Sequence, residues 1–375
     1  MTPADIEAII FRVAPLPHSG ASQIAAVPVI SSYVLRGLPA FARDELGEKI
    51  LQRANRAAGF DVELIEDRNC YIPQQAVLGF VETIAKAAGE ANLGLLLAPV
   101  MNVAAYGSFG RYVFGAGTLG EAIDRSIAAL RYHSTYDKLS VTTLADEVSY
   151  SYTFASAGCA GYEIAASAAA GELLSLLRAY LPDSWRPLRI ELDIATPPNT
   201  SPFEDVFQCP VVFNAPAVTV VFERSRLAAL SKRASRPIMT LTDVARDRPD
   251  GAPQSLFNIA VEQIRAQLLS GSVSIDDMAR SMDTSVRTLQ RELDRAGTDF
   301  RSLTSAVRVQ RATELLQQTR VSITHISEEL GYSSPAGFTR AFRKATGFGP
   351  REFRDREPGL HPDLGPALPL VASES

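Results

Sequence analysis

Two stretches in the last third of the chain repeat one another. VSIDDMARSMDTS begins at Val273, and VSITHISEELGYS begins at Val321. At this offset of 48 residues the apolar positions coincide, so that Ile275, Met278 and Met282 match Ile323, Ile326 and Leu330. After the turn the offset is 49, and Leu289, Arg291 and Leu293 match Phe338, Arg340 and Phe342. Each copy therefore predicts two short amphipathic helices joined by a tight turn, which is helix-turn-helix geometry.

The residues between the two helices of each copy suit such a turn. Gly331 follows the apolar end of its helix, where a left-handed backbone is usually required. Ser334 can cap the next helix, and Pro335 then takes the first helical position, where its missing N–H costs nothing. In the first copy Asp283 replaces the glycine and Ser285 is the expected cap. Asp tolerates the left-handed conformation better than most residues, so both copies remain compatible with the motif.

The outer side of the second helix in each copy carries hydrogen-bonding side chains. Arg can bond guanine bidentately in the major groove of DNA, and Gln can do the same to adenine. Basic residues also solvate ordinary helices, but two copies in register favour double-stranded DNA as the partner. The helical period gives the expected base-contacting residues as Arg287, Thr288, Gln290 and Arg291 in Val286–Arg295, and Ala336, Thr339 and Arg340 in Pro335–Ala345.

Other side chains near these helices are expected to contact DNA phosphates. They are Ser285, Ser334, Arg308, Arg311, Arg343, Lys344 and Arg351. Between the copies, Phe300–Thr319 has no Gly or Pro and predicts a helix about 30 Å long. Successive major grooves on one face of DNA lie about 34 Å apart, so one chain could contact two adjacent grooves. Phosphate contacts release counterions, and we therefore expect binding to weaken as salt rises.

The second copy departs from the first at the start of its outer helix. Pro335, Ala336 and Gly337 stand where base-contacting polar residues could stand. Gly337 also weakens a helix by about 1 kcal/mol relative to Ala. We therefore expect the first copy to supply most base specificity, and the second to hold phosphates and respond to DNA shape.

Charge and periodicity divide the chain into domains. The net charge is −5, but residues 253–354 carry 14 basic and 11 acidic side chains, which fits a nucleic-acid module joined to an acidic body. An α+β domain is predicted for residues 1–235, followed by a linker rich in Pro, Gly and Asp over 236–254. An all-α domain without strands is predicted for 255–356, and a flexible tail for 357–375.

Within residues 1–235, segments whose apolar residues have helical spacing are interspersed with segments that have strand-like alternation. Helical spacing of apolar residues covers Phe41–Ala58, Pro73–Ala88, Leu119–Tyr132 and Tyr162–Leu181. Strand-like alternation marks Ser149–Phe154, Pro187–Ile194 and Ala217–Phe222. Tyr150 and Tyr152 are expected on one side of a strand in the core. His133 is expected to take part in packing or in the end of a helix rather than to bind a ligand.

Ile326–Arg354 contains the elements GYSS, F-x-R-x-F and G-x-x-P-x-x-F/Y-R, and the first copy contains TLQRELDRAG. With these elements, Ser274–Arg354 resembles the AraC/XylS family of bacterial transcription regulators. A weaker similarity to the arabinose-binding-like sensor domain of one branch of that family covers roughly Gln23–Ser235. The matching residues are Thr118, Leu119, Glu121, Ala122, Phe207, Pro210, Val211, Phe213, Val220, Phe222 and Leu227.

This resemblance implies a sequence-specific DNA-binding regulator whose N-terminal domain binds a small-molecule effector and dimerises. RNA polymerase is an expected partner if the protein is an activator. Members of that branch respond to chemically diverse ligands, so neither the effector nor its binding residues are implied. Closed two-fold dimers are also the commonest oligomers, and a homodimer is expected.

Two alternatives are an N-terminal enzymatic domain with a regulatory DNA-binding tail, and a regulator that responds to a protein partner without an effector. The sequence has no GxSxG elbow, HExxH motif or P-loop lysine, so we expect no enzyme, no catalytic residue and no cofactor. Its four His and three Cys are scattered, and no metal site is expected. No signal or membrane-spanning segment is apparent, and a cytoplasmic protein without a membrane partner is expected.

Overall fold

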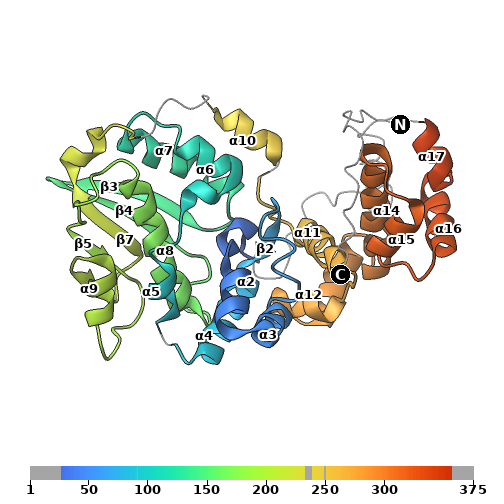
Figure 1. Cartoon of the computed structure of the whole chain (residues 1–375), viewed down its shortest axis with the longest axis horizontal. Helices are drawn as coiled ribbons and strands as arrows, with labels where there is room; N and C mark the ends of the chain where they lie inside the picture. Colours follow the sequence, from blue (N-terminus) through green and yellow to red (C-terminus); the bar gives the residue numbers. More distant parts are fainter. Residues whose placement is uncertain (1–26, 91, 233–238, 249–250, 357–375) are drawn as a thin grey trace, which may run out of the picture. The chain divides into compact units, whose positions relative to one another are not determined.

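The computed structural model describes residues 27–90, 92–232, 239–248 and 251–356 (Figure 1). These residues form two compact units. The larger unit takes in the described residues up to 266 together with 274–289, and the smaller takes in 267–273 together with 290–356. The boundary between the units therefore falls within α11 (Leu256–Leu269) and within α13 (Val286–Arg295).

A five-stranded sheet forms the centre of the larger unit. In spatial order its strands are β3 (Lys138–Leu144), β4 (Glu147–Thr153), β7 (Val218–Glu223), β5 (Arg189–Glu191) and β6 (Val211–Val212). Neighbouring strands are antiparallel except for β5 and β6. A second, two-stranded sheet pairs β1 (Val29–Ser31) with β2 (Tyr71–Pro73).

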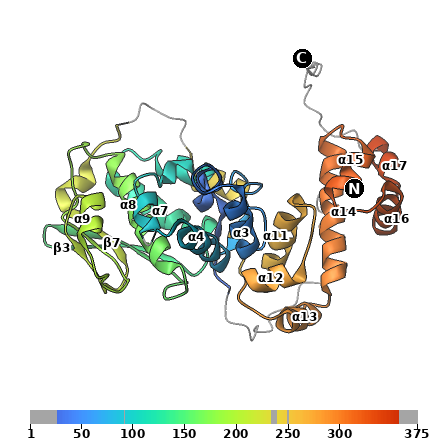
Figure 2. The ribbon, with the colours of Figure 1, turned by 60° about the horizontal axis from the view of Figure 1, so that its bottom comes forward.

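Helices of the larger unit surround these sheets. They are α2 (Leu38–Phe41), α3 (Glu48–Ala58), α4 (Gln74–Ala88), α5 (Leu93–Leu97), α6 (Gly107–Val113), α7 (Leu119–Ala129), α8 (Tyr162–Arg178), α9 (Ser201–Phe207), α10 (Leu241–Asp247) and α12 (Ile275–Ser281). Figure 2 shows α12 beside α3, and these two helices are in contact.

One face of β4 meets both α7 and α8. The pleat turns Val148, Tyr150 and Tyr152 to the same, buried face of the strand. The Tyr150 hydroxyl lies 2.8 Å from the Ser126 hydroxyl of α7, and Tyr152 lines a cavity together with residues of α8. Both tyrosines were expected in the core, and burial of their side chains confirms this.

Helices α5 and α8 cross at a very short distance because each supplies a glycine. A Cβ on Gly171 of α8 would lie 2.0 Å from the carbonyl oxygen of Ala98. A Cβ on Gly94 of α5 would lie 2.5 Å from the carbonyl oxygen of Ile164. Real side chains cannot occupy such spaces, so the two backbones touch at the crossing. This contact fixes the position of the residue after Gly171, which is Glu172.

Most of the expected elements of the N-terminal part are present. Helices α3, α4, α7 and α8 and strands β4, β5 and β7 lie where periodicity predicted them, and the mixed α+β architecture is confirmed. The segment expected as a linker contains a helix, α10, which begins at a capping box between Thr240 and Asp243. The expected C-terminal tail lies outside the described residues.

Residues 115–120 read GAGTLG, the glycine spacing of a dinucleotide-binding loop. In that motif the loop follows a strand. Here it follows helix α6, and the Thr118 side chain caps α7 by accepting a hydrogen bond of 3.2 Å from the Glu121 N–H. The glycines therefore belong to a turn between two helices.

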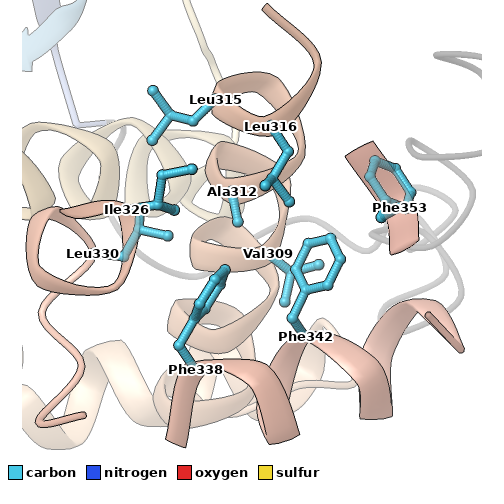
Figure 3. Packing of buried hydrophobic residues seen from close by; sticks show 9 residues of the cluster. All are labelled: Val309, Ala312, Leu315, Leu316, Ile326, Leu330, Phe338, Phe342 and Phe353. Carbon is cyan, nitrogen blue, oxygen red and sulfur yellow. The ribbon is translucent and has the colours of Figure 1, made fainter. Parts of the chain in front are cut away.

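After residue 254 the described chain consists of helices joined by turns and short irregular segments, without a strand. The remaining helices are α14 (Phe300–Gln318), α15 (Ile323–Glu329), α16 (Pro335–Thr346) and α17 (Pro350–Arg356). Side chains from all four meet in one apolar cluster, shown in Figure 3: Val309, Ala312, Leu315, Leu316, Ile326, Leu330, Phe338, Phe342 and Phe353. The long helix α14 was predicted within one residue of its observed bounds, and the predicted all-α architecture is confirmed.

Candidate nucleic-acid interface and ligand cavity

The two predicted turns have the same backbone geometry. Asp283 has a φ of 49° and Gly331 a φ of 70°, so both adopt the expected left-handed conformation. The next N–H reaches five residues back in each copy, from Thr284 to the Ala279 carbonyl at 2.9 Å and from Tyr332 to the Ser327 carbonyl at 3.0 Å. Duplication of the sequence thus corresponds to duplication of a hydrogen-bonded turn.

Serine caps begin the second helix of each copy, as expected. The Ser285 hydroxyl accepts a hydrogen bond of 3.1 Å from the Thr288 N–H, and Ser334 accepts one of 3.2 Å from the Gly337 N–H. The Ser285 hydroxyl also lies 2.8 Å from that of Thr288. These caps hold the first turns of α13 and α16 in a helical conformation.

Helix α13 separates a buried side from a polar one. Leu289 and Leu293 are completely buried, whereas Arg287, Gln290 and Arg291 are exposed. Thr288 is half-buried. The Arg291 side chain remains 53% exposed, and its Nε lies 3.7 Å from the carboxylate of Glu292. The outer side predicted from the period is therefore the accessible side of this helix.

Helix α16 has the same division but fewer polar groups at its start. Phe338 and Phe342 are buried, while Ala336 and Arg340 are exposed. The Thr339 hydroxyl donates a hydrogen bond of 2.8 Å to the Pro335 carbonyl within its own helix. A base contact by Thr339 would compete with that bond.

The expected phosphate-contacting cations differ in their surroundings. Arg343, Lys344 and Arg351 are exposed. Arg308 is half-buried, with its guanidinium 5.3 Å from the centre of the Tyr332 ring. Arg311 lies 3.0 Å from Glu314 and 3.7 Å from Glu329, so it links α14 to α15. Arg308 and Arg311 therefore already have structural contacts that a phosphate would have to replace.

Two neighbouring cavities lie against the buried face of β4. The larger has a volume of about 550 Å³, including the part open to solvent, and is bounded by side chains of β1, α2, α4, α5, β4 and α8. The smaller has about 390 Å³ and lies between α6, α7, α8 and the sheet. Tyr152 and Glu172 line both cavities.

Glu172 is the acidic side chain that lines both cavities. Among the described residues its carboxyl group has one hydrogen-bond partner, the Tyr106 hydroxyl, which donates to it. Burial among apolar side chains raises the pKa of Glu172 to about 7, although the hydrogen bond from Tyr106 acts in the opposite direction. Sequence periodicity gave no prediction for this residue. A single carboxylate within the otherwise apolar stretch AASAAAGELLSLL was the available signal.

His133 packs beside this carboxyl group. Its ring stacks on that of Tyr106 at 5.1 Å between centroids and lies equally close to Phe109. Burial lowers the pKa of His133 to about 4, so the imidazole is neutral at physiological pH. The expected packing role of His133 agrees with these contacts, and the ring also lines the smaller cavity.

The titration of Glu172 predicts a pH-dependent stability. Its folded pKa of about 7 exceeds the ordinary value of 4.5, so stability falls as pH rises through this window. His133 acts oppositely, because its lowered pKa makes stability fall as pH drops from 6.5 towards 4. The measurement is therefore the difference in free energy of unfolding between Glu172→Gln and the unsubstituted protein, from chemical denaturation between pH 5 and pH 8. We expect the stability of the variant relative to the unsubstituted protein to increase with pH. A difference that stayed constant with pH would contradict the raised pKa of Glu172.

Comparisons with known proteins agree with both parts of this architecture. Residues 51–230 match the family model described as the arabinose-binding domain of AraC transcription regulators, N-terminal part. Residues 278–356 match a helix-turn-helix domain model. The chain belongs to the AraC family of transcription regulators. It is thus a DNA-binding regulator with an N-terminal ligand-binding domain and a C-terminal helix-turn-helix domain.

Relatives of this AraC-family regulator are themselves transcription regulators. The ornithine utilization regulator of Pseudomonas aeruginosa is 27% identical over 71% of this chain and 79% of its own length. The regulator RipA of Corynebacterium glutamicum is 32% identical over 41% of this chain and 47% of its own length. Among solved structures, the regulator CdpR of Pseudomonas aeruginosa covers 70% of this chain and 86% of its own, with 24% identity and a TM-score of 0.33.

In this AraC-family chain, side chains of α11 bind the backbone of β2. Gln263 donates a hydrogen bond of 3.2 Å to the Tyr71 carbonyl, and the Glu262 carboxylate accepts one of 3.4 Å from the Tyr71 N–H. Arg248, just after α10, pairs with Glu262 at 3.2 Å. It also donates to the Asn69 carbonyl and lies 4.9 Å from the centre of the Tyr71 ring.

No helix in the described part of the chain is both long and apolar enough to cross a membrane.

Proposed function

We propose that this regulator binds its operator through the exposed sides of α13 and α16 and that a small molecule in the cavity beside Glu172 controls it. The duplicated turn carries the first half of the proposal, because it presents two capped helices of the same geometry. Arg287, Thr288, Gln290 and Arg291 would contact bases, with Ala336, Thr339 and Arg340 in the second copy. Ser285, Ser334, Arg308, Arg311, Arg343, Lys344 and Arg351 would contact phosphates.

The burial pattern refines this set. Arg343, Lys344 and Arg351 are exposed, which leaves their side chains accessible to phosphates. Arg308 and Arg311 are held by Tyr332 and by two glutamates, so we propose the weaker phosphate contacts for them. The test is binding of the full chain to operator DNA over a salt series, where affinity should fall steeply. An affinity that stayed flat with salt would contradict the phosphate contacts.

Arg291 and Arg343 should have different effects on sequence recognition. Arg291→Ala is expected to cost about 1–3 kcal/mol on the preferred operator and to relax discrimination at one or two base pairs. Arg343→Ala should weaken binding to all sequences about equally. The measurement is binding of both variants to a library of single-base operator changes. An unchanged sequence profile for Arg291→Ala, or an altered one for Arg343→Ala, would rule out this division of roles.

We further propose a homodimer. Two-fold dimers are the commonest closed oligomers, and a dimer of this chain would present four reading helices to an operator with two-fold symmetry. Light scattering of the full chain at micromolar concentration should give twice the monomer mass of 40.5 kDa. A monomer under these conditions would exclude the dimer. The same two-fold arrangement predicts an operator with two related half-sites.

An activator role is proposed, with RNA polymerase as partner. A urease operon transcriptional activator of Escherichia coli is 32% identical over 26% of this chain and 33% of its own length. We also propose that the protein acts in the cytoplasm and by binding rather than by catalysis. Transcription from the operator in a purified system, with and without the regulator, tests the direction of control.

A further inference from the structure

We propose that the cavity beside Glu172 takes an amphiphilic organic cation, whose ammonium group pairs with the Glu172 carboxylate and whose apolar body fills the larger cavity. This rests on the proposed function, because it names the chemical class of the effector. It goes further by naming the ligand group that is recognised, an ammonium group, and the residue that recognises it, Glu172.

The lining of the larger cavity separates an apolar wall from one polar end. Val34, Val81, Leu97 and Met101 are typical of the wall, and alanines of α8 complete it. Side-chain oxygens enter the lining from two residues, Tyr152 and Glu172. A ligand that fits must therefore be apolar over most of its surface and polar at one end.

The polar end has negative character. The Glu172 carboxyl group receives one hydrogen bond, from Tyr106, and no basic side chain of the described chain forms an ion pair with it. Tyr152 donates its own hydroxyl proton to Asp137 at 2.6 Å, and the Ser134 hydroxyl lies 3.4 Å from the same oxygen, so Tyr152 has no proton of its own to offer a ligand. The neighbouring imidazole, His133, is neutral. A carboxylate that remains without a cation in an apolar site is costly, and an ammonium group would provide the missing partner.

The position of Glu172 is also well defined. It follows Gly171, whose backbone touches Ala98 at the C-terminal end of α5, so α8 cannot shift without breaking the crossing. A rigid helix therefore holds the carboxyl group between the two cavities, as recognition of one ligand class requires.

The experiment compares three probes of equal chain length: n-hexylamine, hexan-1-ol and hexanoate. Each is titrated by calorimetry into the full chain at pH 8, and the melting midpoint is recorded. We expect the amine to bind at least about tenfold more tightly than the alcohol, because a charge-assisted pair adds to the same apolar contact. Hexanoate should bind most weakly.

Two variants identify the residue responsible. Glu172→Gln keeps the shape and removes the charge, so it should still fold, and it should bring the amine affinity down to that of the alcohol. Glu163→Gln, at an exposed position of the same helix, should leave all three affinities unchanged. Operator affinity is measured in parallel with and without the amine.

Equal binding of amine and alcohol, tighter binding of hexanoate, absence of binding by all three probes, or an unchanged amine affinity in Glu172→Gln would each overturn the proposal. Failure of the proposed function gives a different result. In that case the amine binds through Glu172 but operator affinity does not change. An unrelated compound that changes operator affinity without displacing the amine would leave regulation intact and contradict the effector class.

Discussion

Phe342→Ala is expected to lower the free energy of unfolding of the smaller unit by about 3–5 kcal/mol, the cost of removing a large aromatic side chain from a packed core. Phe342 has no exposed surface, and its ring lies 5.7 Å from that of Phe338 and 5.3 Å from that of Phe353. It belongs to the cluster through which α14, α15, α16 and α17 hold one another (Figure 3). The truncation therefore leaves a cavity where four helices meet.

DNA binding should fall together with this stability. Helix α16 carries the outer residues of the second helix-turn-helix, and Phe338 and Phe342 attach it to the remaining helices. Calorimetric unfolding and operator binding are the measurements. Phe342→Leu keeps most of the volume and should cost less than about 1.5 kcal/mol. Lys344→Ala, two residues further on and exposed, should change stability by no more than about 0.5 kcal/mol. A loss below about 1 kcal/mol for Phe342→Ala would contradict the packing.

The sequence predicts the helix-turn-helix part closely because its signals are local. Helix α13 has the predicted bounds, and its cap, turn and apolar period all lie within about fifteen residues of one another. Asp283 adopts the left-handed conformation although it is not a glycine. The preceding helix and the following cap determine this conformation together.

Several elements were not predicted, for different reasons. Strands β1 and β2 have three residues each, and Val29 pairs with Pro73 far along the chain. Strand β3 was missed because Leu139 is its one buried residue, so its apolar alternation is weak. Helix α10 was overlooked within the expected linker, although Thr240 and Asp243 formed a recognisable capping box.

The cavity could not be located from periodicity. Its walls come from separate strands and helices that meet only after folding. Glu172 could be recognised as a carboxylate in an apolar helix, but its partner Tyr106 lies 66 residues away. Spacing within one helix contains no information about such a pair.

Arg248→Ala is expected to lower the free energy of unfolding of the larger unit by about 3 kcal/mol, since it removes one partner of a buried ion pair. The Glu262 side chain is 8% exposed and that of Arg248 is 22% exposed, so water screens the pair only weakly. Without Arg248 the carboxylate keeps Arg265, at 2.9 Å, which lowers the expected loss. The variant also loses the contacts of Arg248 with the Asn69 carbonyl and the Tyr71 ring.

This substitution should also weaken the link between the ligand cavity and α11. Arg248 lines a small cavity together with Tyr106 and His133, and Tyr106 is the hydrogen-bond partner of Glu172. A candidate route therefore starts at Glu172, which is bonded to Tyr106, and crosses the small cavity that Tyr106 and Arg248 both line. It ends at Glu262, the ion-pair partner of Arg248 on α11, the helix before the first helix-turn-helix. If this route transmits ligand binding, operator affinity in Arg248→Ala should respond less to a ligand that still binds the cavity.

A matched control and a double-mutant cycle separate the ion pair from general destabilisation. Arg246→Ala removes an arginine of α10 that is 74% exposed and paired with Asp243, and it should cost less than about 0.5 kcal/mol. Glu262→Gln in the Arg248→Ala background should recover part of the lost stability, because the buried carboxylate then needs no cation. The cycle compares four proteins: the unsubstituted chain, Arg248→Ala, Glu262→Gln and the double variant. Their unfolding in denaturant gives the coupling energy between Arg248 and Glu262. Additive effects of the two substitutions, or an equal loss in Arg246→Ala, would show that this ion pair does not hold α11 to β2.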